Sequence, residues 1–180
     1  MTKEEFARRL TNACDAVIQA EAELTEIGSQ FGDADHGLTM TKVAKAIAQA
    51  VAASDGGIQT MLDDAAMAVM SLNGGSAVPL WNTWLDGLQE EAPEGEEIDV
   101  AGLKAIFAKA LEELEDMSGA KVGDKTMMDA LIPASEAVAE ATKQYVSKFG
   151  RAKSYGTKTI GTPDAGAVSM SWFFQGLARE

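Results

Sequence analysis

The chain has 180 residues, with 28 acidic against 15 basic residues, a net charge of -13, 46% hydrophobic residues and one cysteine. This length suits one domain with a buried core. A single cysteine excludes a disulfide framework within the chain and favours a reducing compartment. The excess of negative charge argues against non-specific nucleic-acid binding, which requires Lys and Arg to neutralise phosphates.

No segment approaches the roughly 20 consecutive apolar residues that span a bilayer. The first ten residues, MTKEEFARRL, have neither the apolar run of a signal peptide nor the acid-poor character of a transit peptide. We therefore expect a cytoplasmic protein without a membrane span. If the chain handles phosphates, something other than its own basic residues must offset the repulsion.

Apolar residues recur at intervals of three and four, whereas strict alternation is almost absent, and this pattern predicts helices. In chain order, the predicted helices are a long first helix ending at about Ile27, then 43–51, 61–72, 80–88, 103–117, a second long helix over 125–148 and a last one over 168–177. The Ser118-Gly119 pair predicts a glycine stop, and Pro133 predicts a kink. About eight amphipathic helices, these seven and any further short one, predict an all-α fold, an eight-helix antiparallel up-and-down bundle or closed α-barrel, made by a single domain over residues 1–180.

The segment at 90–97, EEAPEGEE, is rich in charge and proline and could mark a domain boundary. Each flanking half has only three or four predicted helices, and glycine-rich loops occur on both sides. We therefore interpret it as a solvated loop.

The first such loop, residues 32–37, places two carboxylates and an imidazole between glycines, just before a helix. Mg²⁺ prefers oxygen ligands and is usually held by one or two carboxylates together with phosphates. A helix N-terminus nearby favours bound phosphate. The alternative is that Asp33 and Asp35 only cap the helix, a role for which Asp is well suited.

The chain has one histidine, His36, and this limits the possible mechanisms. A nucleophile paired with histidine would have to use it, but Cys14 lies on the apolar face of a predicted helix and is interpreted as a buried small residue. A zinc site would have one His and one Cys and would fill its other positions with carboxylates. The sequence therefore favours oxygen-ligand chemistry.

Three further glycine-containing loops lie at predicted helix ends, at 73–76, 123–127 and 161–166. The first, Asn-Gly-Gly-Ser, could bring bare backbone close to a ligand, although it lacks the strand and the Gly-Lys-Ser/Thr of a Walker A loop. Each loop could also be a simple helix cap. The functional interpretation requires that the four loops converge.

Five segments together resemble the nucleotide-binding subunit of dihydroxyacetone kinases, the DhaL-type domain: GDADHGLTM at 32–40, the glycine pair with Pro-Leu-Trp at 74–81, GDKTMMDALIPA at 123–134, GRAK at 150–153 and TIGTPDAGAVS at 159–169. The resemblance covers essentially the whole chain in order. It implies an eight-helix antiparallel barrel that holds ADP or ATP and two Mg²⁺ ions at one end. It also implies that the substrate, chiefly dihydroxyacetone, is bound by a separate DhaK-type subunit.

The resemblance also implies roles for individual residues. Asp33 and Asp35 match Mg²⁺ ligands, and His36, Gly37, Leu38 and Thr39 match residues that lie against the phosphates. The remaining matches to nucleotide-binding positions are Ser76, Ala77, Gly119, Met127, Arg151, Asp164, Ala165 and Gly166. No protein base is required, because metal ions can stabilise the transferring phosphoryl group.

Three positions depart from the family pattern. Gly28 stands where the family has a third aspartate, five residues before Asp33. The loss of this carboxylate should loosen a metal site unless water or a neighbour such as Glu26 replaces it. Ala77 and Val78 stand where the family has Ser-Gly, and a Val tolerates positive φ poorly, so either the loop path differs or the glycine served close packing. Asn82 replaces a small residue.

The leading hypothesis is a phosphotransferase subunit that acts on a triose or tetrose, with either free ATP or a DhaM-type phosphotransferase-system protein as phosphoryl donor. The alternative is a degenerate nucleotide-binding module that regulates a partner without transfer. Homodimerisation stays open, and nucleic-acid and membrane partners are not expected.

Overall fold

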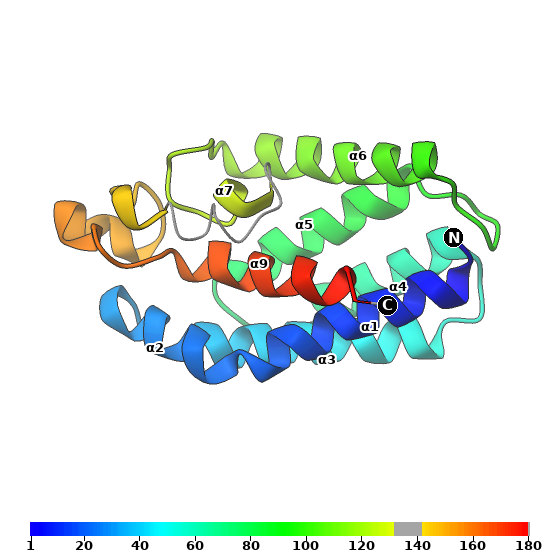
Figure 1. Ribbon diagram of the computed structural model, residues 1–180, viewed down its shortest axis with the longest axis horizontal. Coiled ribbons are helices and arrows are strands. Elements are labelled where there is room, and N and C mark those ends of the chain that lie inside the picture. The colour runs from blue at the N-terminus through cyan, green and yellow to red at the C-terminus, as the bar shows by residue number, and fades with distance from the viewer. Residues whose placement is uncertain (132–141, 180) are drawn as a thin grey trace.

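Helices that run along one long axis make up most of the computed structural model, which describes residues 1–131 and 142–179 (Figure 1). The longer ones are α1 (Lys3–Gln19), α2 (Glu21–Phe31), α3 (His36–Ala53), α4 (Ile58–Met70), α5 (Ala77–Glu90), α6 (Val100–Ser118) and α9 (Ala165–Leu177). The shorter ones are α7 (Met128–Leu131) and the 3-10 helices η1 (Thr142–Gln144) and η2 (Arg151–Thr159). Within these residues the β-structure is limited to one isolated bridge between Thr2 and Glu97, which confirms the all-α prediction.

The long helices pack in a ring. α9 packs on α1, α1 on α3, α3 on α4, α4 on α5 and α5 on α6. Aromatic side chains close the ring between α6 and α9, where the ring centroids of Phe107 and Phe174 are 6.2 Å apart. In Figure 1, α2 and η2 lie at the end of the bundle that is remote from both chain termini. In the described part of the chain, no helix is both long enough and apolar enough to cross a membrane.

An aromatic cluster forms part of the core that the ring encloses. Trp81 and Trp84 on α5 meet Phe173 on α9 edge to face, with centroid separations of 5.2 and 5.3 Å. All three side chains are buried. Edge-to-face pairs of this kind add to the energy of burial, so they hold α5 and α9 firmly against each other.

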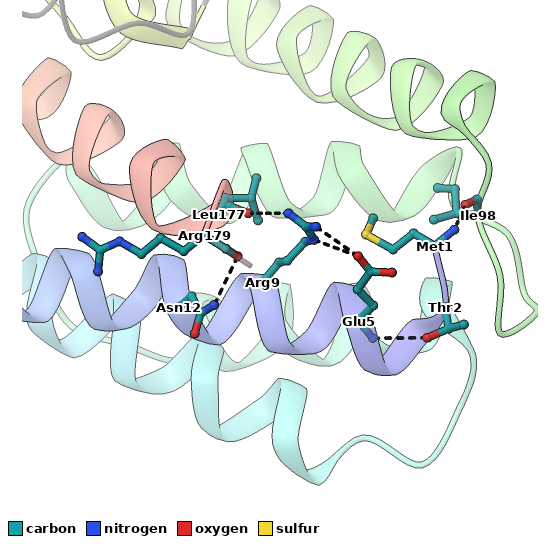
Figure 2. A network of polar contacts seen from close by, with 8 residues as sticks. All are labelled: Met1, Thr2, Glu5, Arg9, Asn12, Ile98, Leu177 and Arg179. Atoms are coloured by element: carbon teal, nitrogen blue, oxygen red, sulfur yellow. Dashed lines mark hydrogen bonds and ion pairs between the residues drawn. The ribbon is translucent and has the colours of Figure 1, made fainter.

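The end of the bundle that carries both termini is held by polar contacts between α1 and the C-terminus of α9 (Figure 2). Arg9 donates to the main-chain oxygen of Leu177 at 3.4 Å and to Glu5 at 3.0 Å. Asn12 donates to the main-chain oxygen of Arg179 at 3.4 Å. A cation at a helix C-terminus is favourable because it meets the negative end of the helix dipole. These contacts therefore fasten α1 to the C-terminal end of α9.

The segment at 90–97 is a loop between α5 and α6, as predicted, and it also caps α4. The main-chain oxygens of Gly95 and Pro93 accept from the N–H groups of Ile58 and Gln59, at 2.9 and 3.0 Å. These N–H groups belong to the first turn of α4, where no side chain caps the helix. The loop therefore supplies the missing acceptors.

Two predicted helices differ from the structure. The first long helix is interrupted at Ala20, and its second part, α2, continues to Phe31 rather than ending at about Ile27. The second long helix, predicted over 125–148, is wrong at both of its described ends, because Lys125 has a left-handed φ of 61° and residues 142–149 hold only a short 3-10 turn. Residues 132–141, which include Pro133 and its predicted kink, lie outside the described residues.

At the first of these two ends, the physical reason is the side chain of Asp129. Its two carboxylate oxygens accept from the N–H groups of Gly123 and Thr126, at 2.6 and 2.8 Å. A carboxylate that satisfies nearby backbone donors competes with helix formation. By contrast, the predicted stop of α6 is confirmed, since Gly119 caps it with a left-handed φ of 63°.

Candidate functional site

The four glycine-containing loops converge on one cavity of about 280 Å³, at the end of the bundle that carries α2 and η2. Each predicted loop contributes to its wall, together with the end of α2 and the segment around η2. The lining residues are Ile27, Gly28, Phe31, Gly32, Asp33, Asp35, His36, Thr39, Gly75, Ser76, Ala77, Leu80, Trp81, Lys125, Thr126, Met127, Ser147, Phe149, Gly150, Arg151, Ala152, Pro163, Asp164, Ala165 and Gly166. The convergence that the functional interpretation requires is therefore present.

The two candidate metal ligands are free of the capping role that was the alternative explanation. Asp35 stands at the N-cap position of α3, but its side chain makes no capping hydrogen bond. Asp33 instead forms an ion pair with Arg151 of η2, and both residues line the cavity. Both side chains of this pair are substantially exposed, at 42% for Asp33 and 63% for Arg151. The carboxylates thus remain available to a ligand.

His36 opens α3 and lines the cavity. Burial lowers the pKa of His36 to about 4, although a hydrogen bond with the backbone of Ala165 acts in the opposite direction. Its buried Nε2 has no hydrogen-bond partner among the described residues. A neutral imidazole with an unsatisfied buried nitrogen is unfavourable unless a ligand completes it, because an unpaired buried polar atom loses its hydration.

Most of the predicted nucleotide-binding residues line this cavity, but three do not. Gly37 packs against α2, where an added Cβ would lie 2.2 Å from the main-chain oxygen of Glu21. Leu38 points to the surface and is 52% exposed. Gly119 caps α6 and does not line the cavity. The predicted residues that the structure brings together there are His36, Thr39, Ser76, Ala77, Met127, Arg151, Asp164, Ala165 and Gly166, with Asp33 and Asp35.

The capping alternative fails for Ser76 and holds for Asp164. Ser76 occupies the N-cap position of α5 without a side-chain hydrogen bond. Asp164 caps α9, accepting from the N–H of Ala167 at 2.8 Å. Burial raises the pKa of Asp164 to about 6, against the opposing effect of that hydrogen bond and of Lys125. Asp164 therefore has a structural role in addition to its place in the cavity wall.

Two of the departures from the family pattern have a clear place in the structure. Gly28 lines the cavity from α2, and a Cβ built on it would lie 3.2 Å from Cβ of His36. Val78 is helical and buried, and its Cγ2 would be 2.5 Å from a Cβ on Gly74. Because Val78 is helical, it needs no positive φ. Its side chain fills the space that Gly74 leaves open.

Several lining residues were missed by sequence reasoning. Lys125 was assigned to the start of a helix, and Ser147 and Phe149 fell in or next to its predicted end. Phe31 lies beyond the predicted end of the first helix. The only sequence signal was the Gly-Asp-Lys-Thr run itself, in which the lysine was not distinguished from other helix-start residues.

The donor set fits a magnesium ion whose ligands include both carboxylate and phosphate oxygens. In residues 1–131 and 142–179 no group of three His, Cys, Asp or Glu side chains is close enough to hold a metal ion by itself. Glu26, the suggested replacement for the third aspartate, is exposed and is not among the lining residues. Mg²⁺ commonly uses one or two carboxylates and completes its shell with phosphate oxygens and water, which the lining by Asp33 and Asp35 allows.

Fold and site together define a class: a helical domain whose loops form a cavity suited to a phosphorylated ligand and a divalent cation. Comparison with known proteins identifies the family. A family model described as the DAK2 domain matches residues 30–141 and 134–179. The chain belongs to the DAK2 domain family.

Its relatives include both long and short proteins. The chain is 31% identical to the D-erythrulose kinase of Mycolicibacterium smegmatis over 92% of its own length but only 33% of that protein. It is 27% identical to the ADP-binding subunit DhaL of the PEP-dependent dihydroxyacetone kinase of Escherichia coli, over 92% of this chain and 91% of that subunit. The chain thus spans about a third of the erythrulose kinase and nearly all of the subunit.

A solved structure confirms the fold. The crystal structure of the dihydroxyacetone kinase from C. freundii, in complex with AMP-PNP and Mg²⁺, superposes on 96% of this chain with a TM-score of 0.73 and 21% identity. The chain covers 33% of that protein. The eight-helix all-α fold predicted from the sequence is therefore the fold of this neighbour over the matched part.

Proposed function

We propose that the chain binds ADP or ATP with Mg²⁺ and acts as the phosphotransferase subunit of a kinase for dihydroxyacetone or a related triose or tetrose ketose. The observation that carries the proposal is the convergence of Asp33 and Asp35, the N-terminus of α3 and Arg151 on one cavity. A carboxylate pair, a positive helix end and an arginine are the groups that a magnesium nucleotide requires. The membership of the DAK2 domain family supports the same function.

In this proposal each side of the cavity has its own task. Asp33 and Asp35 hold magnesium, which neutralises charge on the phosphates when bound. His36 and Thr39, in the first turn of α3, would lie against the phosphates at the positive end of the helix, although the N–H of Thr39 already donates to the main-chain oxygen of Asp35. Arg151 contributes the positive charge that the acidic chain otherwise lacks there. The number of Mg²⁺ ions, which we expect to be two, rests on the family resemblance.

The other wall of the cavity suits the base and the sugar. Met127, Leu80 and Trp81 provide apolar surface near the bare backbone of Gly75 and Ser76. A cavity of about 280 Å³ is smaller than typical ligand sites, and two of its lining residues, Asp33 and Arg151, form an ion pair. Nucleotide binding is therefore expected to exchange the Asp33–Arg151 contact for contacts with metal and phosphate. Ala77, Asp164, Ala165 and Gly166 would border the ligand, whereas Gly119 would act only through its cap of α6.

The ketose is proposed to lie on a separate DhaK-type subunit. The relatives of similar length are named as ADP-binding subunits, and the long kinases are about three times the length of this chain. Some relatives are named as PEP-dependent or PTS-dependent enzymes. We therefore propose either ATP or a DhaM-type phosphoprotein as the donor.

A second candidate is a nucleotide-binding module without transfer activity. Gly28 favours it, because this position on the cavity wall lacks the carboxylate of the family pattern. With two carboxylates rather than three, magnesium would be held more loosely.

The binding claim can be tested on the purified chain. We expect adenine nucleotide to be released on denaturation, or the nucleotide-free chain to be stabilised against heat by Mg²⁺-ADP. Asp33→Ala should abolish the Mg²⁺-dependent part of that stabilisation while the helical circular dichroism stays unchanged. If the wild type releases no nucleotide and is not stabilised by Mg²⁺-ADP, both candidate functions are wrong.

The transfer claim needs a second subunit. The nucleotide-loaded chain is mixed with a DhaK-type subunit, with dihydroxyacetone or erythrulose, and with ATP or a phosphoprotein donor, and ketose phosphate is measured. Product that depends on this chain supports the kinase. Tight nucleotide binding without product under any donor supports the regulatory module.

A further inference from the structure

Lys125 is a buried lysine in the wall of the cavity whose ammonium group is surrounded by main-chain oxygens. The residue is only 4% exposed. Its Nζ donates to the carbonyl oxygens of Thr159 and Thr162, both at 2.6 Å, of Thr142 at 3.0 Å and of Tyr145 at 3.3 Å. Burial lowers the pKa of Lys125, and the nearby charge of Asp164 acts in the opposite direction. A buried ammonium is costly unless it is hydrogen-bonded, and these four oxygens meet that need.

The four oxygens lie at the two ends of one loop, residues 142–162, which we call the Arg151 loop: Thr142 and Tyr145 at its start, Thr159 and Thr162 at its end. Its ends also contact each other directly: the N–H of Gly161 donates to the oxygen of Lys143 at 2.7 Å, and the N–H of Ser147 to Oγ1 of Thr159 at 3.0 Å. Between those ends, the loop lines the cavity with Ser147 and residues 149–152. The Lys125 ammonium therefore sits at the base of the loop that carries Arg151.

The backbone at Lys125 is itself held in an unfavourable conformation. Its φ of 61° is left-handed, which is uncommon for a residue other than glycine. The buried carboxylate of Asp129 holds the turn on both sides of it, through the N–H groups of Gly123 and Thr126. A lysine at this strained position is explained by its side chain, which reaches the four oxygens from there.

We infer that Lys125 is a positioning residue for the nucleotide site: it fixes the base of the Arg151 loop and thereby holds Arg151 in the cavity wall beside Asp33. An ammonium has three N–H donors, and four carbonyl oxygens already compete for them, so the group has no donor left for a phosphate. The inference rests on the proposed function for the identity of the ligand that Arg151 meets.

The first test needs no ligand. Hydrogen exchange of the free chain is compared for Lys125→Met, Lys125→Gln and the control Lys158→Met, which removes the same charge from an exposed position in the same loop. We expect exchange over residues 145–162 to rise about tenfold in both Lys125 variants and to stay unchanged in the control. Equal exchange in all three variants would overturn the inference. So would loss of the whole helical signal in both Lys125 variants, because Lys125 would then stabilise the entire fold rather than the loop.

The second test measures Mg²⁺-ADP affinity by calorimetry for Lys125→Met, Arg151→Met and the double variant. Each single change should weaken binding about tenfold, and the double variant should bind no more weakly than Arg151→Met, because Lys125 acts through Arg151. Independent, additive losses would contradict the inference. If the wild type binds no nucleotide, the proposed function fails, whereas the exchange measurement still decides the role of Lys125 in holding the loop.

Discussion

Replacing Gly28 by aspartate is the perturbation that separates a metal-facing position from a merely structural one. A Cβ at this position would lie 3.2 Å from Cβ of His36, so the neighbour must move by a few tenths of an ångström. A glycine in a helix interior costs about 1 kcal/mol relative to alanine, which offsets that strain. Gly28→Ala should therefore stay within about 1 kcal/mol of the wild type. It is the matched control for Gly28→Asp.

The aspartate variant should respond to magnesium in a way that the alanine variant does not. Without metal, a third carboxylate beside Asp33 and Asp35 adds repulsion, and we expect Gly28→Asp to be less stable than Gly28→Ala by about 1 kcal/mol. With Mg²⁺-ADP, an added oxygen ligand should tighten binding about tenfold, or about 1.4 kcal/mol.

The assay is urea unfolding in EDTA and in saturating Mg²⁺-ADP, with calorimetric titration of both variants. The order of stability of the two variants should reverse when metal and nucleotide are added. An identical response of the two variants to Mg²⁺ would refute the reasoning, because position 28 could not then face the metal.

Three further outcomes follow from packing and burial. Gly87→Ala should lower the free energy of unfolding, measured in urea, by about 1–3 kcal/mol, because its Cβ would lie 2.6 Å from Cα of Ala110. The control Gly95→Ala, with open space around it, should leave the free energy of unfolding unchanged, and equal losses in both variants would contradict the α5–α6 contact. The pKa of Asp164 is raised from 3.8 to about 6, so this group's contribution to stability is present below pH 3.8 and is lost as the pH rises through 6. Urea unfolding should therefore show that Asp164→Asn gains stability relative to the wild type between pH 3.8 and 6, and a difference that stays constant with pH would contradict this. Burial raises the pKa of Cys14 to about 12, so a thiol reagent at pH 8 should label it only after unfolding, and rapid labelling of the folded chain would contradict its burial.

The helical architecture was predictable because apolar spacing reports which face of each helix is buried. Gly119 marked the end of α6 in the sequence, since a left-handed cap favours glycine. The break at Ala20 carried no such signal, because alanine is a good helix former and the interruption depends on tertiary packing. The start of the helix predicted over 125–148 was misread, because the carboxylate of Asp129 binds the N–H groups of Gly123 and Thr126 and the chain becomes helical only at Met128.

The candidate site was predictable as a set of loops, but the contacts between the loops were not. The order of antiparallel helices indicated which loops could share an end of the bundle, and the cavity confirms that they do. The ion pair of Asp33 with Arg151 and the carbonyl contacts of Lys125 join segments far apart in the chain. Periodicity and spacing carry no information on such pairs, because they depend on how the helices pack.

Calorimetric titration of ADP into the nucleotide-free chain, once with Mg²⁺ and once with EDTA, tests the central claim most directly. Our account predicts one nucleotide bound per chain with Mg²⁺, and binding that is weakened or lost in EDTA or in Asp33→Ala. The absence of ADP binding in both titrations would contradict it. Binding that is unaffected by EDTA and by the loss of Asp33 would contradict it as well.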